Sequence, residues 1–144
     1  MRPSPHPRAD YPRFVHLTTR WMDNDVYAHL NNVVAYSLFD TAVNQILIET
    51  GALDIPGGPV VGLVVETGCS YLGQMRFPDR IAAGVRVGRI GTSSVRYEVG
   101  LFRNEEERAS AQGHFIHVYV DAQTHRPVPL PKTLRQVLET LQAP

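Results

Sequence analysis

The strongest helical pattern lies in the first third of the chain, where apolar residues recur three and four positions apart, at Tyr36, Phe39, Val43, Ile46 and Leu47. This spacing is typical of a helix with one buried face. Asn31 or Asn32 can cap the start, because an Asn side-chain oxygen accepts a bond from an N–H one turn on. Gly51 suits the end, since glycine readily adopts the left-handed backbone that follows a helix. The pattern predicts a helix of about 18 residues, or roughly five turns.

Strands are indicated on both sides of this helix. A short β-like run precedes it at residues 14–20, and a run rich in β-branched residues follows it at 60–72. Apolar and polar residues then alternate in three further runs, at residues 79–90, 93–103 and 112–121. Gly62 and Gly68, within the run at residues 60–72, suggest a bulge or a close backbone approach. A second, shorter helix is expected near the end, with an apolar side made of Leu134, Val137, Leu138 and Leu141.

The order of these elements predicts an α+β fold. Short turns between the later strands favour antiparallel neighbours, and one long apolar helix needs a sheet to cover it. We therefore expect an antiparallel sheet of about five strands wrapped around one central helix, in a single domain over residues 13–142. Residues 1–12 are rich in Pro and Arg and are expected to be a flexible tail or an arm on a neighbouring chain. The helix covers only one sheet face, which suggests a homo-oligomer, either a dimer or a dimer of dimers.

Composition narrows the functional classes. The formal net charge of the 144 residues is zero, which does not suggest non-specific nucleic-acid binding. No apolar run reaches the roughly 20 residues of a membrane span, and the N-terminal segment lacks the apolar core of a secretory signal. The single cysteine, Cys69, cannot form an internal disulfide and fits a reducing compartment. A cytoplasmic location is expected.

Candidate chemistry is concentrated just before the long helix. Five polar residues fall within ten positions there, namely Asp23, Asp25, His29, Asn31 and Asn32. A polar run that ends at a helix start places carboxylates beside backbone N–H groups that have no partner inside the helix. We therefore expect the functional site at this junction between strand and helix.

The same run resembles a family motif. Residues 23–32 read DNDVYAHLNN, which is similar to the pattern D-x-D-x-x-G-H-V-N-N of hot-dog-fold acyl-CoA thioesterases of the hydroxybenzoyl-CoA thioesterase-like family, with Ala28 where that pattern has glycine. The resemblance covers nearly all of residues 12–142. It implies a hot-dog fold, an acyl-CoA substrate and a pairing of sheets into a dimer. It also implies that the second aspartate of the motif, Asp25, is catalytic.

Thioester hydrolysis gives the remaining residues their expected roles. Asp25 can activate water or attack the carbonyl carbon directly, and N–H groups near Asn32 and Val33 can hold the oxyanion at the positive end of the helix dipole. His29, Asn31 and Asn32 are expected beside the substrate. Some relatives hold the CoA nucleotide with a basic cluster near the turn after residue 90. This chain has Arg89 and Arg96 near that turn, and either could contact the nucleotide. Arg89, Thr92 and Ser93 are therefore further substrate-binding candidates. No metal or other cofactor is required.

Several residues also have structural interpretations. Asp23 is better explained as a turn or capping carboxylate than as a catalytic group. His29 could position the backbone instead of touching substrate, and the two asparagines are helix caps first. A metal cluster of Asp23, Asp25 and His29 is disfavoured because hard metals need more oxygen ligands. Glu66 could face either solvent or a partner's active site.

Two other functions remain open. A hot-dog hydratase or dehydratase would carry a D-x-N-P-x-H arrangement, but here the second aspartate is followed by Val-Tyr-Ala-His. A non-catalytic acyl-CoA-binding protein would keep the cleft without the base, and the presence of Asp25 argues against it. No residue reports the acyl group, and an acyl carrier protein thioester is also a possible substrate.

Overall fold

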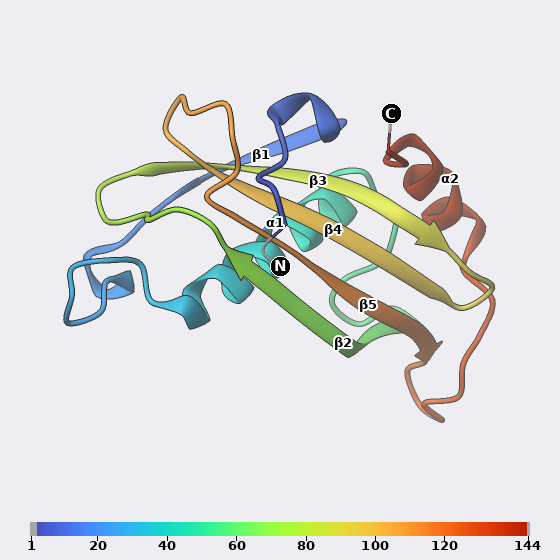
Figure 1. Ribbon diagram of the computed structural model, residues 1–144. Helices are drawn as coiled ribbons and strands as arrows, with labels where there is room; N and C mark the ends of the chain where they lie inside the picture. The colour runs from blue at the N-terminus through green and yellow to red at the C-terminus, as the bar shows by residue number, and fades with distance from the viewer. Residues whose placement is uncertain (1–2, 144) are drawn as a thin grey trace.

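The computed structural model describes residues 3–143 as a five-stranded antiparallel sheet with one long helix across one face (Figure 1). The strands are β1 (Arg13–Thr18), β2 (Val60–Tyr71), β3 (Arg80–Ile90), β4 (Ser94–Arg103) and β5 (Ala111–Asp121), in the spatial order β1-β3-β4-β5-β2. The helices are α1 (Asn32–Glu49) and α2 (Lys132–Thr140), with 3-10 turns at Arg8–Asp10 and Trp21–Asp23. The predicted α+β architecture is confirmed.

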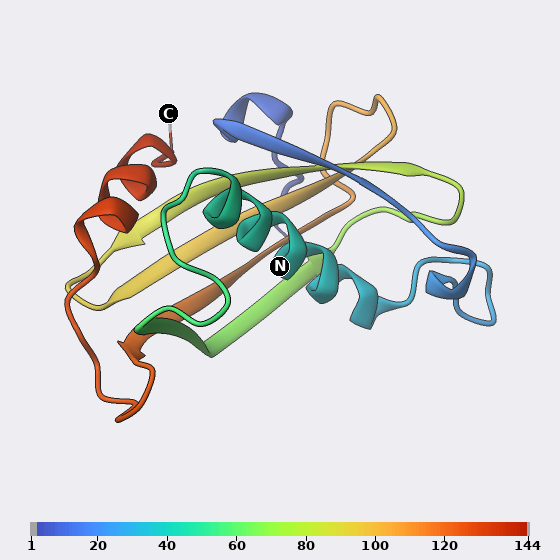
Figure 2. The same ribbon diagram turned by 180° about the vertical axis from the view of Figure 1, so that it is seen from behind.

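Helix α1 forms as its sequence indicates. It has 18 residues, and the Val33 N–H donates to the cap oxygen Oδ1 of Asn31 at 3.0 Å. Gly51 follows the helix with φ of 67°, the left-handed conformation expected after a helix end. The inner face is fully packed against the sheet, through Ala35, Leu38, Phe39, Ala42, Val43, Ile46 and Leu47. Figure 2 shows α1 lying across the sheet.

The strands turn alternate residues toward this helix. Odd-numbered apolar residues of β3 and β4 form the core, among them Val85 and Tyr97, while Arg86 and Glu98 pair on the outer face at 2.7 Å. A Cβ at Gly62 would lie 2.9 Å from a ring carbon of Tyr119, so the predicted close backbone approach occurs there. The register shift of β2 lies a little further on, between Val64 and Glu66.

The two ends of the sheet carry different loops. At one end Thr18 of β1 pairs with Arg80 of β3, and the chain leaves from here toward the start of α1. At the other end β3 turns into β4 after Ile90, and α2 docks through a bond from the Val87 N–H to the Leu141 carbonyl at 2.7 Å. Because Val60 pairs with the end of β5, strand β2 begins at this second end. We call these the helix-start end and the hairpin end (Figures 1 and 2).

The N-terminal segment differs from the expected flexible tail. Residues 3–12 lie along the outer face of the sheet, where the His6 N–H donates to Gln112 at 2.9 Å and the Arg8 guanidinium donates to the Asn104 carbonyl at 2.8 Å. Tyr11 is only 5% exposed and packs on Phe102. Burial raises the pKa of the Tyr11 hydroxyl to about 12. Pro and Arg content suggested mobility, but a buried aromatic ring anchors the described part of this segment.

Candidate active site

The loop between β1 and α1 holds its two aspartates in different environments. Asp23 is 3% exposed and accepts bonds from the backbone N–H of Arg20 at 2.8 Å and from its guanidinium Nη2 at 3.0 Å. Its carbonyl accepts the Asn31 N–H at 2.8 Å. The Asp23 carboxylate thus closes the 3-10 turn, which is the structural role expected for it.

Asp25 is partly exposed and only one of its carboxylate oxygens is engaged within residues 3–143. That oxygen, Oδ1, accepts the Tyr27 N–H at 2.8 Å and the His29 N–H at 3.3 Å. The Asp25 N–H donates to the His29 carbonyl at 2.8 Å, which closes the loop. Backbone bonds therefore fix the carboxylate while Oδ2 is left for another group.

Ala28 explains why the family pattern has glycine at this position. Its φ is 60°, in the left-handed region that a side chain disfavours by about 1–2 kcal/mol. This conformation directs the chain after Ala28 back toward Asp25, whose N–H donates to the His29 carbonyl at 2.8 Å. The loop keeps the same closed shape with alanine, at the cost of some backbone strain.

The loop is fixed from both sides. The Leu30 N–H donates to the Met75 carbonyl at 2.7 Å, and the Phe77 N–H donates to the side chain of Asn24 at 3.0 Å. At the start of α1 the Tyr71 hydroxyl donates to the Asn32 carbonyl at 2.7 Å, which links the helix start to the end of β2. His29 is half-buried and contributes its backbone to the loop. The helix start and Asp25 therefore belong to one rigid unit.

Not all predicted site residues meet in one chain. Asp25, His29, Asn31, Asn32 and Val33 gather at the helix-start end. Arg89, Thr92 and Ser93 lie at the hairpin end, where the carbonyls of Thr92 and Ser93 accept bonds from the Leu130 and Tyr119 N–H groups. The length of β3, 11 residues, separates the two groups within a chain. Sequence spacing could not reveal this, because it does not report which sheet end a turn occupies.

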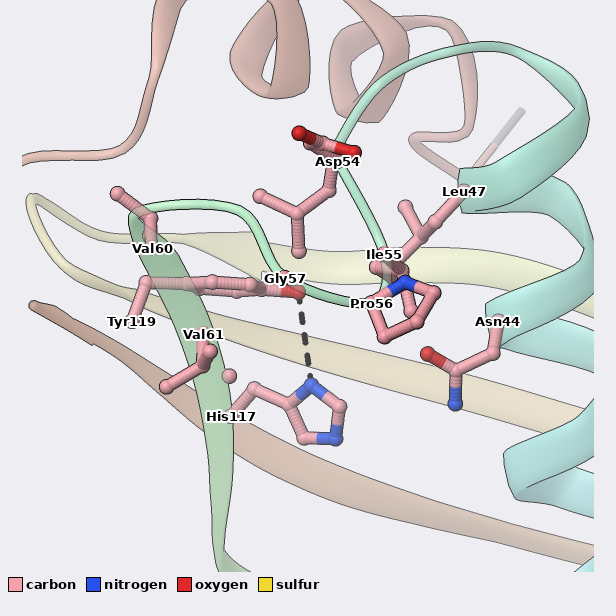
Figure 3. Close-up of a pocket in the computed structure, with 12 residues that line it drawn as sticks. Asn44, Leu47, Asp54, Ile55, Pro56, Gly57, Val60, Val61, His117 and Tyr119 are labelled. Carbon is pink, nitrogen blue, oxygen red and sulfur yellow. Dashed lines mark hydrogen bonds between the residues drawn. The ribbon is translucent and has the colours of Figure 1, made fainter. Parts of the chain in front are cut away.

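A second site-like feature was not anticipated. A pocket of about 170 Å³ lies between the second half of α1 and the start of β2, lined in part by Asn44, Gly62 and His117 (Figure 3). His117 faces the helix and is 5% exposed. Burial lowers its pKa to about 4, with a smaller opposing effect from the Asp40 charge. His114 and His117 lie an odd number of positions apart on β5, so they face opposite sides of the sheet; this spacing gives no sign of a pocket.

Several large apolar side chains near the motif are exposed, including Trp21, Met22, Val26 and Tyr27.

Within residues 3–143 no group of three or more His, Cys, Asp or Glu side chains is placed to hold a metal ion. No helix in this part of the chain is both long and apolar enough to cross a bilayer.

A closed aspartate loop at the start of a helix, with a five-stranded antiparallel sheet wrapped on that helix, is the arrangement expected of a hot-dog thioesterase. The chain belongs to the Thioesterase-like superfamily, whose sequence model matches residues 19–138. It is a thioester hydrolase with the hot-dog fold, as the motif predicted. None of the curated proteins matches the chain.

Solved structures agree with this assignment. The PA5185 protein from Pseudomonas aeruginosa strain PAO1 is 50% identical, with 98% of each chain covered and a TM-score of 0.94. A thioesterase from Thermus thermophilus, complexed with coenzyme A and Zn, is 29% identical over 92% of this chain and 96% of that one, with a TM-score of 0.73. Slr0204, a 1,4-dihydroxy-2-naphthoyl-CoA thioesterase from Synechocystis, is 13% identical over 87% of this chain and 93% of that one, with a TM-score of 0.78, and it shares the fold.

Proposed function

We propose that the chain hydrolyses acyl-CoA thioesters to a free acid and CoA, with Asp25 as the catalytic carboxylate. The observation that carries this proposal is the asymmetry of Asp25, in which two backbone N–H groups hold Oδ1 and no described residue engages Oδ2. A carboxylate fixed in this way has a set direction and a reactive oxygen. The relative complexed with coenzyme A supports CoA as the thiol part of the substrate.

Two routes use this oxygen. As a general base, Asp25 takes a proton from water while the water oxygen bonds to the thioester carbon, and the collapsing intermediate expels the CoA thiolate. As a nucleophile, Asp25 itself bonds to that carbon and forms a mixed anhydride as CoA leaves, and water then hydrolyses the anhydride. Both routes place negative charge on the former carbonyl oxygen and both return the carboxylate unchanged.

The donor for that oxyanion is assigned to the first N–H of α1. The sequence suggested the N–H groups near both Asn32 and Val33 as donors. The Val33 N–H already donates to the Asn31 side chain at 3.0 Å, so the Asn32 N–H is the remaining donor for the oxyanion. The helix dipole adds partial positive charge at this position. The bond from the Tyr71 hydroxyl to the Asn32 carbonyl, in the next peptide along, anchors the residue that carries this N–H.

We further propose that the active unit contains two chains joined along β2. This 12-residue strand is an edge of the sheet in the described chain, and it exposes three successive apolar residues, Leu63, Val64 and Val65, at 42%, 54% and 61%. Long apolar edges invite pairing with another strand. Pairing β2 antiparallel with its own copy would give the free edge of β2 a partner strand in both chains. A dimer of dimers through other surfaces is compatible with this unit.

The same pairing explains the separated candidate residues. If two copies of β2 pair over their full length, Val60 lies opposite Tyr71 of the partner subunit, beside the partner's helix start. The hairpin end of one chain then approaches the helix-start end of the other. Arg89, with Thr92 and Ser93 beside it, is proposed to hold the CoA nucleotide for the partner's active site. Arg96 is less suited to this role because it pairs with Glu98 at 2.8 Å.

Thiol release from a panel of acyl-CoAs, followed with Ellman's reagent, tests the proposal. We expect release with at least one acyl-CoA and loss of release in Asp25→Asn. Hydration of an enoyl-CoA without thiol release would instead support a hydratase. Tight acyl-CoA binding with no reaction of either kind would support a binding protein.

A further inference from the structure

The pocket beside His117 has no role in the chemistry proposed above. Its wall is mostly apolar, with Leu47, Leu53, Ile55, Pro56, Val60 and Val61 among its lining residues. Figure 3 shows His117 and Asn44 on opposite sides of the pocket, with the side-chain oxygen of Asn44 turned inward. An apolar cavity with a few converging polar groups is the usual form of a small-molecule site.

One buried atom in this wall lacks a partner. The Nε2 atom of His117 is itself buried and makes no hydrogen bond within residues 3–143, and the whole residue is 5% exposed. Burial keeps the ring neutral near pH 7, so Nε2 is either a donor or an acceptor, depending on the tautomer. The other nitrogen, Nδ1, lies 3.5 Å from the Tyr119 hydroxyl, which in turn bonds to Tyr97 at 2.6 Å. A buried polar atom is costly unless a partner is supplied.

The surroundings indicate what kind of partner fits. Asp54 lines the pocket, and the charge of Asp40 acts on His117 from α1. Two carboxylates disfavour an anionic group there. The space beside the ring depends on Gly62, since a Cβ at this position would lie 3.0 Å from Nδ1 of His117 and 2.9 Å from Tyr119. An uncharged hydroxyl or carbonyl group at the end of an apolar chain meets these conditions.

The position of the pocket relates it to a partner's active site. The pocket adjoins Val60, at the start of β2. It also lies far from its own helix start, because the rise along α1 from Asn32 to Asn44 is roughly 18 Å at about 1.5 Å per residue. In the proposed dimer, Val60 lies opposite Tyr71 of the partner subunit, which holds the partner's helix start. In that dimer the pocket would lie beside the partner's helix start, within reach of a thioester bound there.

We propose that this pocket receives the far end of the acyl group and that His117 selects acyl chains ending in an uncharged hydrogen-bonding group, such as a hydroxyl. The inference rests on the proposed thioesterase function and names the substrate class of the same site. A plain alkyl chain would fill the cavity but leave Nε2 of His117 without a partner. A chain ending in a carboxylate would meet the charges of Asp54 and Asp40.

The test compares acyl-CoAs of equal chain length with and without a terminal hydroxyl, over a series of lengths. The measured quantity is the ratio of kcat/KM for the hydroxylated chain to that for the plain chain. We expect wild-type protein to show a ratio of about ten or more at the best-fitting length, as one added hydrogen bond can provide. His117→Phe keeps an aromatic ring against Phe115, whose ring centroid is 4.7 Å away, and should lower the ratio to about one.

Two further variants separate recognition from folding. His117→Gln retains a hydrogen-bonding side chain and should keep part of the preference. His114→Phe is the matched control, because His114 lies on the same strand but the outer face, paired with Glu66 at 2.9 Å, and it should leave the ratio unchanged. A wild-type ratio of one or less at every length, or an unchanged ratio in folded His117→Phe, would overturn the proposal.

A second measurement covers the case of an inactive enzyme. If no acyl-CoA is hydrolysed, the thioesterase proposal fails, and the pocket is then judged from the rise in melting temperature on adding each acyl-CoA. A larger rise with the hydroxylated chain, lost in His117→Phe, would support the pocket by itself. Equal rises would reject it.

Discussion

Exchange of each motif aspartate for asparagine should separate chemistry from folding. In Asp25→Asn the amide oxygen can still accept the N–H groups of Tyr27 and His29, now at 2.8 and 3.3 Å, so the loop should keep its shape. The variant loses the base or nucleophile. We expect kcat to fall by about 10²–10⁴-fold, the usual contribution of a positioned acid or base. This corresponds to roughly 2.7–5.4 kcal/mol of transition-state stabilisation.

Asp23→Asn should lower the stability of the fold and leave the rate of the reaction largely unchanged. Both Asp23 oxygens accept bonds from Arg20, one from the backbone and one from the guanidinium. An amide puts an NH₂ group against one of these donors, at a site that is 3% exposed. A buried group left unsatisfied costs about 1–3 kcal/mol, which lowers the melting temperature of a chain of this size by roughly 2–12 °C. The rate per folded molecule should change much less.

The assay combines steady-state thiol release on the best acyl-CoA with thermal melts of wild-type protein and both variants. KM should move less than kcat in Asp25→Asn, because binding rests on the acyl and CoA contacts. If Asp25→Asn keeps near-wild-type kcat while Asp23→Asn is inactive, the roles are reversed. If neither exchange affects the rate, the active site lies elsewhere and the proposed mechanism fails with it.

Three further predictions concern assembly, CoA binding and pH. Light scattering should give at least twice the 16.1 kDa chain mass, and a monomer at micromolar concentration would refute the β2 interface. KM should rise with ionic strength, because salt screens exposed phosphate contacts. Arg89→Gln should flatten that rise; if KM of the variant and of wild-type protein rises equally with salt, Arg89 does not hold the CoA phosphates. The pKa of buried His117 is lowered to about 4, so the unfolded chain binds more protons between about pH 6.5 and 4, and the free energy of unfolding should fall as pH drops through this range by up to about 3 kcal/mol. Denaturant titrations should show that His117→Phe weakens this dependence; an identical profile would mean that His117 does not titrate as described.

Local patterns predicted the fold well because each one has a short-range physical cause. The three- and four-residue spacing placed α1, and the cap at Asn31 and the glycine at position 51 set its ends. Alternation assigned the correct faces to β3 and β4, with Val85 and Tyr97 inward. These features depend on the period of the backbone, which a sequence shows directly.

The features that sequence reasoning missed depend on long-range contacts. His117 and Gly62 border one pocket because β2 returns beside β5, and nothing near either residue in the sequence indicates this. The ring of Tyr11 is buried against residues far along the chain, at Gly84 and Gly100. Arg89 was grouped with Asp25 through the family resemblance, and only the register of β3 shows that one chain keeps them apart.

The docked N-terminal segment has an evolutionary consequence. A Cβ at Gly84 would lie 2.7 Å from Tyr11, and a Cβ at Gly100 would lie 2.8 Å from the same ring. The aromatic residue and the two glycines therefore constrain one another, since a side chain at either glycine would displace the ring. In a lineage that loses this segment, the outer face of β3 and β4 at these two glycines would be open to water, and selection would favour larger residues at both positions. Homologues should thus fall into two groups, one with the aromatic arm and both glycines, and one with neither.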